Sequence, residues 1–236
     1  MEKIILFYPI KIDGKEVKTL NADTNALTAK QFLEATRQAG VMSNKMMEVN
    51  TELHMYLGAF ACVNGEADID VMDVLRVKGY DIVQITNVGQ NMMHPDDTYT
   101  FNDKTITFEN AIEGKNEYEY DYSSITVEQF SKAYDKAGVM TNKVKELNDA
   151  LHIYLGAYAV ANTNDIAVEQ VLDGVRGRDV IILACLGRSF FTKPAEDMMS
   201  KEEDSQASNS AEQLDHTQES IIAESEKLDD GQSEDF

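Results

Sequence analysis

Hydrophobic and polar positions follow two different patterns along the first hundred residues. Residues 3–12 are rich in β-forming side chains and end at Asp13-Gly14, a dipeptide typical of a two-residue hairpin turn, and residues 15–20 then return as a second strand. From Phe32 onward, apolar residues recur at spacings of three and four, which is the period of an amphipathic helix. The pattern therefore predicts a β-hairpin followed by helices.

Two stretches, 28–31 and 126–129, have the Ser/Thr-x-x-Glu/Gln pattern of a helix capping box. The short helices that begin there are predicted to stop at Gly40 and Gly138, since glycine readily adopts the left-handed conformation that ends a helix. A longer, central helix is predicted to follow in each case, capped by Ser43 or by Thr141. Its apolar stripe consists of Met46, Val49, Leu53, Tyr56 and Phe60 in one stretch, and of Val144, Leu147, Leu151, Tyr154 and Tyr158 in the other.

Small residues form a neighbouring stripe on each central helix, at His54, Gly58 and Ala61 and again at His152, Gly156 and Ala159, and they predict the close approach of another helix. A short helix is expected at 70–76 and 167–174. The last apolar helices, 82–93 and 180–191, are predicted to be capped by Asp81 and Asp179.

The chain repeats itself. Shifting the sequence by 98 residues aligns 27–61 with 125–159 without a gap, and 19 of those 35 pairs are identical. A repeat this long indicates a duplicated domain rather than a solenoid. We expect an α+β, mainly helical fold of two tandem homologous units, 1–93 and 98–193, each an N-terminal β-hairpin followed by three to four helices.

Charge separates the end of the chain from the rest. Residues 195–236 contain 14 acidic and 2 basic residues, a net charge of −12, which leaves −9 of the total −21 for residues 1–194. The segment is rich in Glu, Asp, Ser and Gln, and we expect a disordered acidic tail; within it, 217–228 is a candidate transient helix or docking segment. No basic stripe suggests nucleic-acid binding. The longest apolar run, 153–161, is too short to span a membrane, and we expect a cytoplasmic protein.

The motifs that usually carry catalysis or metal binding are missing from the sequence. None of the four histidines stands three or four residues from another His or Cys, and Cys62 and Cys185 fall at non-equivalent positions, so we expect buried thiols and no metal or cofactor. The repeated His54 and His152 are interpreted as packing histidines that bond to Asn50 and Asn148, with a ligand or a general base as the alternative. The run EYEYDY is interpreted as an exposed strand, with an acidic docking strip as the alternative. An enzyme is the least favoured class.

The order of these elements resembles the tail assembly chaperones of long-tailed bacteriophages and prophages. The resemblance rests on the hairpin PIKIDGKEVKTL, on the helix starts LTAKQF and SITVEQF, on the central helix, and on the closing segments DVLRVKGYDIVQITNVGQNMM and QVLDGVRGRDVIILACLGRSFF. The chain departs from that family in carrying two units, and the hairpin proline is missing from the second.

The resemblance implies a non-catalytic protein of the infected bacterial cytoplasm that binds the tape measure protein, keeps it soluble, promotes assembly of tail tube protein around it, and is absent from the mature virion. Self-association is a further expectation. The alternatives are a structural tail component of the virion and a pseudo-dimeric cytoplasmic adaptor without a phage role. We expect partner binding by the aromatic and methionine residues at the ends of the apolar stripes: Tyr56, Phe60, Met92, Met93, Tyr154, Tyr158, Phe190 and Phe191.

Overall fold

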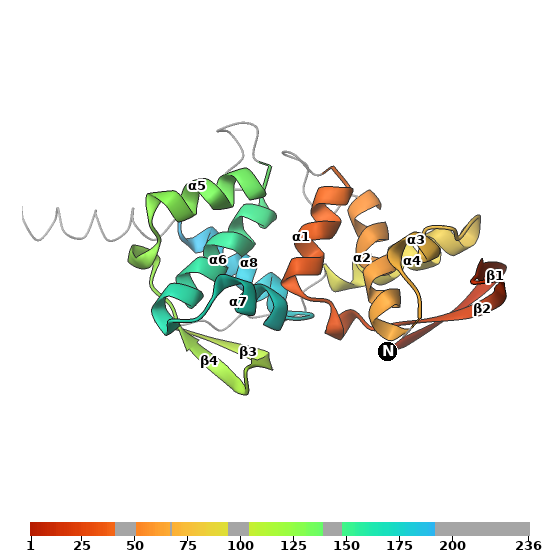
Figure 1. Cartoon of the computed structure of the whole chain (residues 1–236), viewed down its shortest axis with the longest axis horizontal. Helices are drawn as coiled ribbons and strands as arrows, with labels where there is room; N and C mark the ends of the chain where they lie inside the picture. Colours follow the sequence, from red (N-terminus) through yellow and green to blue (C-terminus); the bar gives the residue numbers. More distant parts are fainter. Residues whose placement is uncertain (41–50, 67, 94–103, 139–147, 192–236) are drawn as a thin grey trace, which may run out of the picture. The chain divides into compact units, whose positions relative to one another are not determined.

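The computed structural model describes residues 1–40, 51–66, 68–93, 104–138 and 148–191. Within these residues the protein is α+β, with eight α-helices and two antiparallel sheets of two strands each (Figure 1). The order of elements in the first half, strand–strand–helix–helix–helix–helix, recurs in the second half. The predicted fold class is therefore confirmed at this level.

The first hairpin forms around the predicted turn, and the second hairpin forms around an equivalent turn. Strands β1 (Glu2–Ile12) and β2 (Lys15–Ala22) are joined through Asp13 and Gly14, whose φ values of 47° and 80° place both residues in the left-handed region that a tight hairpin turn requires. Strands β3 (Thr105–Ile112) and β4 (Lys115–Glu119) are joined through Glu113 and Gly114, with φ values of 52° and 82°.

The first helix of each half begins and ends where the sequence predicts. The side chain of Thr28 accepts a hydrogen bond from the backbone N–H of Gln31, and the Gln31 side chain accepts from the N–H of Thr28. The second capping box makes the same pair of bonds. Helices α1 (Ala29–Gln38) and α5 (Val127–Lys136) end before Gly40 and Gly138, which have φ values of 61° and 63°.

The remaining helices follow in the predicted order, and a 3₁₀ turn precedes the first helix of each half. The turns are η1 (Thr24–Ala26) and η3 (Tyr122–Ser124); the central helices are α2 (Thr51–Gly65) and α6 (Asp149–Asn164); the short helices are α3 (Val71–Val74) and α7 (Val168–Gly174); and the last helices are α4 (Tyr80–Met92) and α8 (Asp179–Ser189).

The predicted cap of the second central helix is wrong. Helix α6 begins at Asp149, because Asn148 has an extended backbone and its side chain accepts a hydrogen bond of 2.8 Å from the N–H of Leu151. Asn148, not Thr141, therefore caps the helix, since its side-chain oxygen satisfies an N–H of the first turn. The start of α2, including Ser43 and the stripe residues Met46 and Val49, and the stripe residues Val144 and Leu147 all lie outside the described residues.

The small-residue stripes do allow close helix packing. A Cβ atom added at Gly58 of α2 would lie 1.9 Å from the carbonyl oxygen of Ile85 in α4, and one added at Gly89 would lie 1.9 Å from that of His54. The second half shows the same close approach. A Cβ atom added at Gly156 of α6 would lie 2.4 Å from a backbone oxygen of α8, and one added at Gly187 of α8 would lie 1.8 Å from a backbone oxygen of α6. Each helix pair thus crosses with the two backbones in contact.

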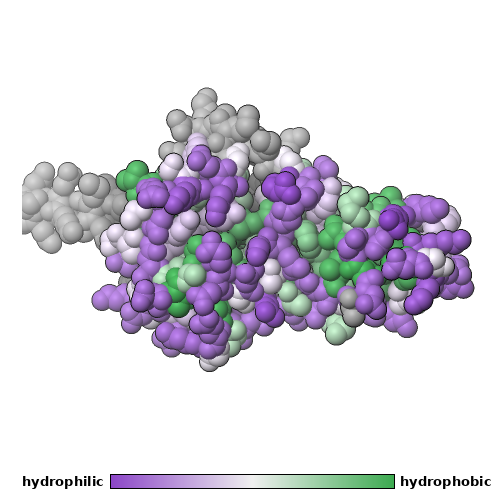
Figure 2. Space-filling model, viewed as in Figure 1, coloured by the Kyte–Doolittle hydropathy of each residue, from purple (hydrophilic) through white to green (hydrophobic). Residues whose placement is uncertain are grey.

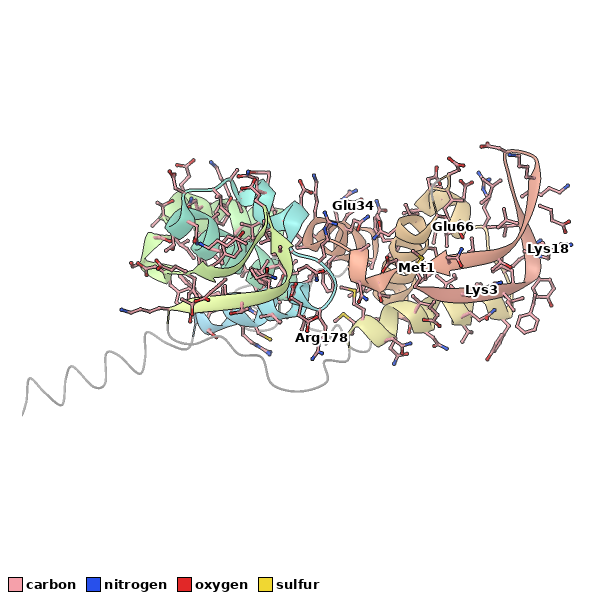
Figure 3. All side chains as sticks on the ribbon, turned by 90° about the horizontal axis from the view of Figure 1, so that it is seen from below. Met1, Lys3, Lys18, Glu34, Glu66 and Arg178 are labelled. Carbon is pink, nitrogen blue, oxygen red and sulfur yellow. The ribbon has the colours of Figure 1, made fainter. Side chains whose placement is uncertain are left out.

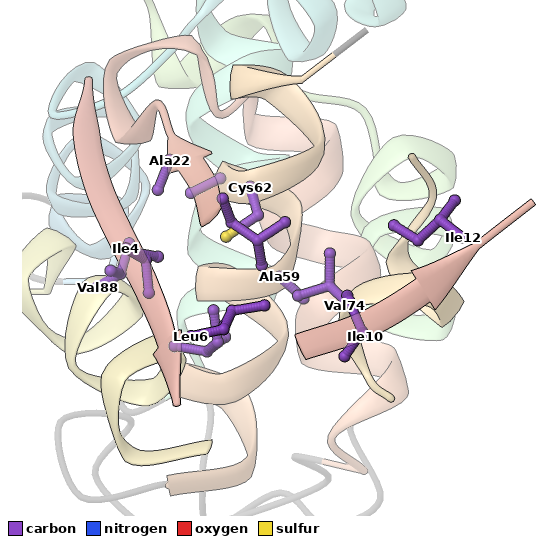
Figure 4. Close-up of a cluster of buried hydrophobic side chains, with 12 residues drawn as sticks. Ile4, Leu6, Ile10, Ile12, Ala22, Ala59, Cys62, Val74 and Val88 are labelled. Atoms are coloured by element: carbon purple, nitrogen blue, oxygen red, sulfur yellow. The ribbon is translucent and has the colours of Figure 1, made fainter. Parts of the chain in front are cut away.

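A hydrophobic core under the first hairpin joins both strands to the helices (Figure 4). Inward-facing β1 residues such as Ile4 and Leu6 pack with Cys62 of α2 and Val88 of α4. Full burial of such side chains contributes about 1.5–3 kcal/mol each, so the hairpin is held mainly by this face. The core consists of Ile4, Leu6, Ile10, Ile12, Leu20, Ala22, Ala59, Ala61, Cys62, Val74, Ile85 and Val88.

Residues 1–190 form one compact unit, in which the two halves are in direct contact. Boundaries between two units at residues 93 and 98 stay a prediction. The predicted acidic tail, 195–236, lies outside the described residues. Among the described helices, none combines the length and the apolar character that crossing a membrane requires.

Candidate partner-binding groove

An apolar groove of about 440 Å³ lies where the two halves meet. Its apolar lining comes from Leu33 of α1, Phe60 of α2, Tyr154 of α6 and Leu172 of α7. Charged side chains surround this lining, so that the groove has an apolar floor and a charged rim. The lining consists of Lys30, Gln31, Leu33, Glu34, Arg37, Phe60, Lys136, Tyr154, Glu169 and Leu172.

Backbone hydrogen bonds fix the two walls of the groove against each other. The N–H of Ala29, at the start of α1, donates to the carbonyl of Val175 just after α7 at 2.9 Å, and the N–H of Gly177 donates to the carbonyl of Leu27 at 2.8 Å. These bonds form a short antiparallel β-bridge centred on Thr28 and Arg176. The groove is thus built on a defined junction, and its walls are aligned before any partner binds.

Ion pairs at the rim hold several charged side chains in place. The Lys30 ammonium lies 3.2 Å from the carboxylate of Asp173, across the junction. Within α1, Glu34 accepts two hydrogen bonds from the Arg37 guanidinium, which lower the pKa of the Glu34 carboxyl. These pairs are exposed, so they contribute little stability, but they place charges of both signs around the floor.

The rim also includes an ammonium group above an aromatic ring. The Lys136 Nζ lies 5.6 Å from the centre of the Tyr154 ring, within range of a cation–π interaction. Burial raises the pKa of the Tyr154 hydroxyl, which keeps this side chain neutral around pH 7. Tyr154 therefore offers a mostly apolar surface to the groove.

The structure brings together only some of the residues that the sequence predicts for partner binding. Phe60 and Tyr154 both line the groove, although they stand 94 positions apart in the chain. Tyr56 is half-buried on α2, one turn before Phe60. Tyr158, Met92 and Met93 are at least nine-tenths buried and offer little surface, while Phe190 and Phe191 are half-buried at the end of α8.

Phe190 belongs to a cluster of aromatic rings in the second half. Its ring lies 5.9 Å from that of Tyr122 and 6.0 Å from that of Phe130, and Phe130 also stacks near Tyr134 at 6.3 Å. The Tyr122 hydroxyl donates to the carbonyl of Leu186 at 2.7 Å. This cluster ties η3, α5 and α8 together. We assign it to packing of the second half.

Sequence reasoning missed the role of the two repeated aspartates. Asp81 and Asp179 do not cap their helices: α4 begins at Tyr80 and α8 at Asp179 itself. Each carboxylate is fully buried and instead accepts two backbone N–H groups of the neighbouring strand. Asp81 accepts from Phe7 and Tyr8 at 2.9 Å each, and Asp179 accepts from Glu109 and Asn110 at 2.9 and 2.8 Å.

These bonds lie where the strand pairing shifts register, between Ile5 and Ile10 in β1 and between Thr107 and Ile112 in β3. A bulge leaves N–H groups without ladder partners, and a carboxylate satisfies two of them with charge-assisted hydrogen bonds. The repeated Asp in each last helix therefore clamps the hairpin of its own half.

The bonds to Asp81 and Asp179 show which residues of the two hairpins are equivalent. These equivalent residues differ in polarity. In the first half, Ile5, Phe7 and Tyr8 are exposed, and the Phe7 ring contacts that of exposed Tyr80 at 5.7 Å. In the second half, the positions of Phe7 and Tyr8 are taken by Glu109 and Asn110. The first half thus has an exposed apolar patch that the second lacks.

Positive charge lies beside this patch. Lys3 on β1 and Lys18 on β2 are both exposed and project from the hairpin (Figure 3).

Hydrophobic areas are otherwise scattered over a mostly hydrophilic surface on the face shown in Figure 2.

The EYEYDY run and the repeated His152 can also be placed in the structure. The tyrosines of the EYEYDY run are not on an exposed face: Tyr118 and Tyr120 are 4% and 5% exposed, while Glu117 and Glu119 point to solvent. The alternation of a strand places the aromatic rings inward. The His152 ring nitrogen lies 3.4 Å from the carboxylate of Asp149, and the His152 backbone N–H donates to the Asn148 carbonyl at 3.0 Å, while the Asn148 side chain caps α6.

The part of the chain that the structure describes was expected to hold no metal site. There, no group of three or more His, Cys, Asp or Glu side chains is placed to hold a metal ion. Cys62 is fully buried, as expected, and burial raises its pKa to about 12; Cys185 is only half-buried. Comparison with protein-family models, with curated proteins and with solved structures finds no match to this chain.

Proposed function

We propose that this protein is a non-catalytic tail assembly chaperone of two tandem homologous units, which binds helical segments of a tape measure protein in the cytoplasm of the bacterial host. The observation that carries the proposal is the groove at the junction of the two halves. It has an apolar floor, two aromatic side chains from different halves, and charges of both signs at its rim.

These properties suit an amphipathic helix. Such a helix binds by inserting apolar side chains spaced three and four residues apart into an apolar groove, while its polar face stays in water. Phe60 and Tyr154 supply the flat, rigid contact area that usually dominates binding energy, and their exposure is incomplete, so they lose little side-chain entropy on binding. Because the rim carries charges of both signs, it can pair with the polar side chains of many similar helices rather than of one.

Duplication supports the same proposal. The α1 wall comes from the first half and the α7 wall from the second, so this groove requires two units in one chain. A long helical client offers many similar segments, and a chaperone with several sites gains avidity from them. The strong negative charge of residues 195–236 would keep the complexes apart in solution.

The test uses the full chain and a purified helical fragment of a tape measure protein. The double variant Phe60→Ser with Tyr154→Ser should raise the dissociation constant at least tenfold, measured by calorimetry, with thermal unfolding followed to confirm that the variant is folded. The matched control is Phe7→Ser, which removes an exposed aromatic ring outside the groove and should leave the affinity within about twofold.

The binding results can contradict the proposal in two ways. Equal losses for the control and the groove variant would mean that any exposed aromatic ring contributes and that the groove is not the site. Unchanged binding of the folded groove variant would remove the structural support for the chaperone proposal. A helical peptide with no apolar face should not bind the wild-type chain.

A further inference from the structure

The junction between the two halves uses a surface that the chain carries twice. On one side, Leu27 and Ala29 at the start of α1 are fully buried, and on the other side Val175 is fully buried. The sequence shift of 98 residues maps these positions to others that lie at the outer side of each half. The equivalents of Leu27 and Ala29 are Ile125 and Val127 at the start of α5.

These equivalent residues have no further half of the same chain to pack against, and they are correspondingly more exposed. Val127 is 87% exposed and Ile125 is half-buried, although the same positions in α1 are fully buried. On the other side, Val77 is half-buried where Val175 is fully buried. The outer surfaces thus leave Val127 exposed and Ile125 and Val77 less buried than the residues that form the internal junction.

The backbone on both sides already has the conformation of the internal junction. Thr126 makes the same capping box before α5 as Thr28 makes before α1. After α3, Gly79 has a φ of 62°, close to the 56° of Gly177, whose N–H bonds to the carbonyl of Leu27 in the internal junction. The backbones of the two outer surfaces thus match those of the internal junction, but the Tyr8 ring lies beside Gly79 where the Asn25 backbone lies beside Gly177, and it must move for the same contact to form.

Charge also fits this contact. The exposed residues of α5 carry both signs, and Glu128 pairs with Lys132 at 2.6 Å. The segment that follows α3 carries exposed Lys78 and exposed Arg76, and Arg76 pairs with Asp73. In the internal junction the cation is on α1, at Lys30, and pairs with Asp173 on α7. On the outer surfaces Glu128 takes the position of Lys30, Leu75 that of Asp173 and Lys78 that of Arg176. Attraction between Glu128 of one copy and Lys78 of the next therefore fits the outer contact.

We propose that the chain associates head to tail with further copies of itself, through α5 of one copy and the α3–Gly79 segment of the next. Because the two contacting surfaces differ, the contact is heterologous, and it generates a ring or an open filament. It would also create a second groove. Half-buried Tyr56 would line it as Tyr154 lines the internal groove, whereas Tyr158, the equivalent of Phe60, is only 6% exposed and would offer little surface.

The self-association does not depend on the client, whereas the use of the second groove rests on the proposed function. The test is therefore made on the full chain alone. Size-exclusion chromatography with light scattering over a concentration series should show a mass that rises above that of one chain. Val127→Glu on α5 and Lys78→Glu after α3 should each raise the apparent dissociation constant of self-association at least tenfold. Both sites are exposed, so the variants should fold, which circular dichroism checks.

Mixing the two variants separates a head-to-tail contact from a symmetric one. The Lys78→Glu chain keeps an intact α5 surface, and the Val127→Glu chain keeps an intact α3 surface, so an equimolar mixture should form a 1:1 dimer and grow no further. Phe7→Ser, on the exposed patch of the first hairpin, should leave association unchanged. A wild-type chain that stays monomeric at its highest soluble concentration would overturn the proposal. So would association that survives both charge variants, or that Phe7→Ser abolishes.

Discussion

The crossing of α6 and α8 depends on a backbone contact that one methyl group would break. Gly187 of α8 sits on α6 so closely that an added Cβ would lie 1.8 Å from the carbonyl oxygen of His152 and 2.9 Å from the nitrogen of Gly156. All of these neighbouring atoms belong to the backbone. The substitution Gly187→Ala therefore cannot be accommodated by rotation of a side chain, and the helices must separate.

The expected cost follows from the geometry. Ordinary carbon–oxygen contacts are about 3.3 Å long, so the two helices must move apart by about 1.5 Å at the crossing. Overpacking of a well-packed site costs about 1–3 kcal/mol, and a rigid backbone neighbour favours the upper end. Alanine is preferred over glycine in a helix by about 1 kcal/mol, which offsets part of the cost. We expect a net loss of about 2 kcal/mol in the free energy of unfolding.

Urea unfolding followed by circular dichroism measures this loss. The matched control is Cys185→Ala, two residues earlier in the same helix, where the side chain is only half-buried and the loss should stay below about 1 kcal/mol. A Gly187→Ala variant as stable as the wild type, or more stable, would show that helix propensity decides at this site and that the backbones do not touch.

Three further substitutions test other parts of the structure. Asp179→Asn removes one of the two acceptors for the N–H groups of Glu109 and Asn110, and should lower the free energy of unfolding by about 2–3 kcal/mol in the same urea assay; an unchanged midpoint would contradict the clamp. Thr126→Ala removes the N-cap of α5 and should cost about 1 kcal/mol, with a smaller loss for Thr126→Ser. Burial raises the pKa of the Cys62 thiol from 9.0 to about 12, so the folded state keeps its proton longer than the unfolded state and stability falls as the pH rises above 9.0. Cys62→Ala should reduce that slope by up to about 1.4 kcal/mol per pH unit, measured by urea unfolding between pH 8 and 11.

The sequence predicts the local elements well, because their signals are local. A hairpin turn needs positive φ at two adjacent residues, and Asp13-Gly14 supplies both. A capping box needs Thr and Gln three residues apart, and 28–31 and 126–129 have them. Helix packing through glycine was also predictable, since the small residues recur on one stripe.

The long-range contacts could not be predicted in this way. Asp81 stands one residue inside its helix, where an N-cap is the usual interpretation, and only the folded structure shows that its carboxylate reaches a bulge 74 residues earlier in the chain. The groove has the same origin: its walls meet because the start of α1 bonds to the end of α7. Phe60 and Tyr154 were predicted as partner-binding residues from their stripes, but their meeting in one groove was not.

The differences between the two halves now have a physical interpretation. The halves agree where residues pack inside each half, at the crossing glycines and the clamp aspartates. They differ on the outer surface of the hairpins, where exposed Phe7 corresponds to Glu109, and at the junction surface, where buried Ala29 corresponds to exposed Val127. Two identical halves would present the same junction surface inside the chain and at its outer side, and pairing within and between chains would then compete. Different residues on equivalent surfaces let the internal junction form first, and they leave the outer surfaces to select another partner.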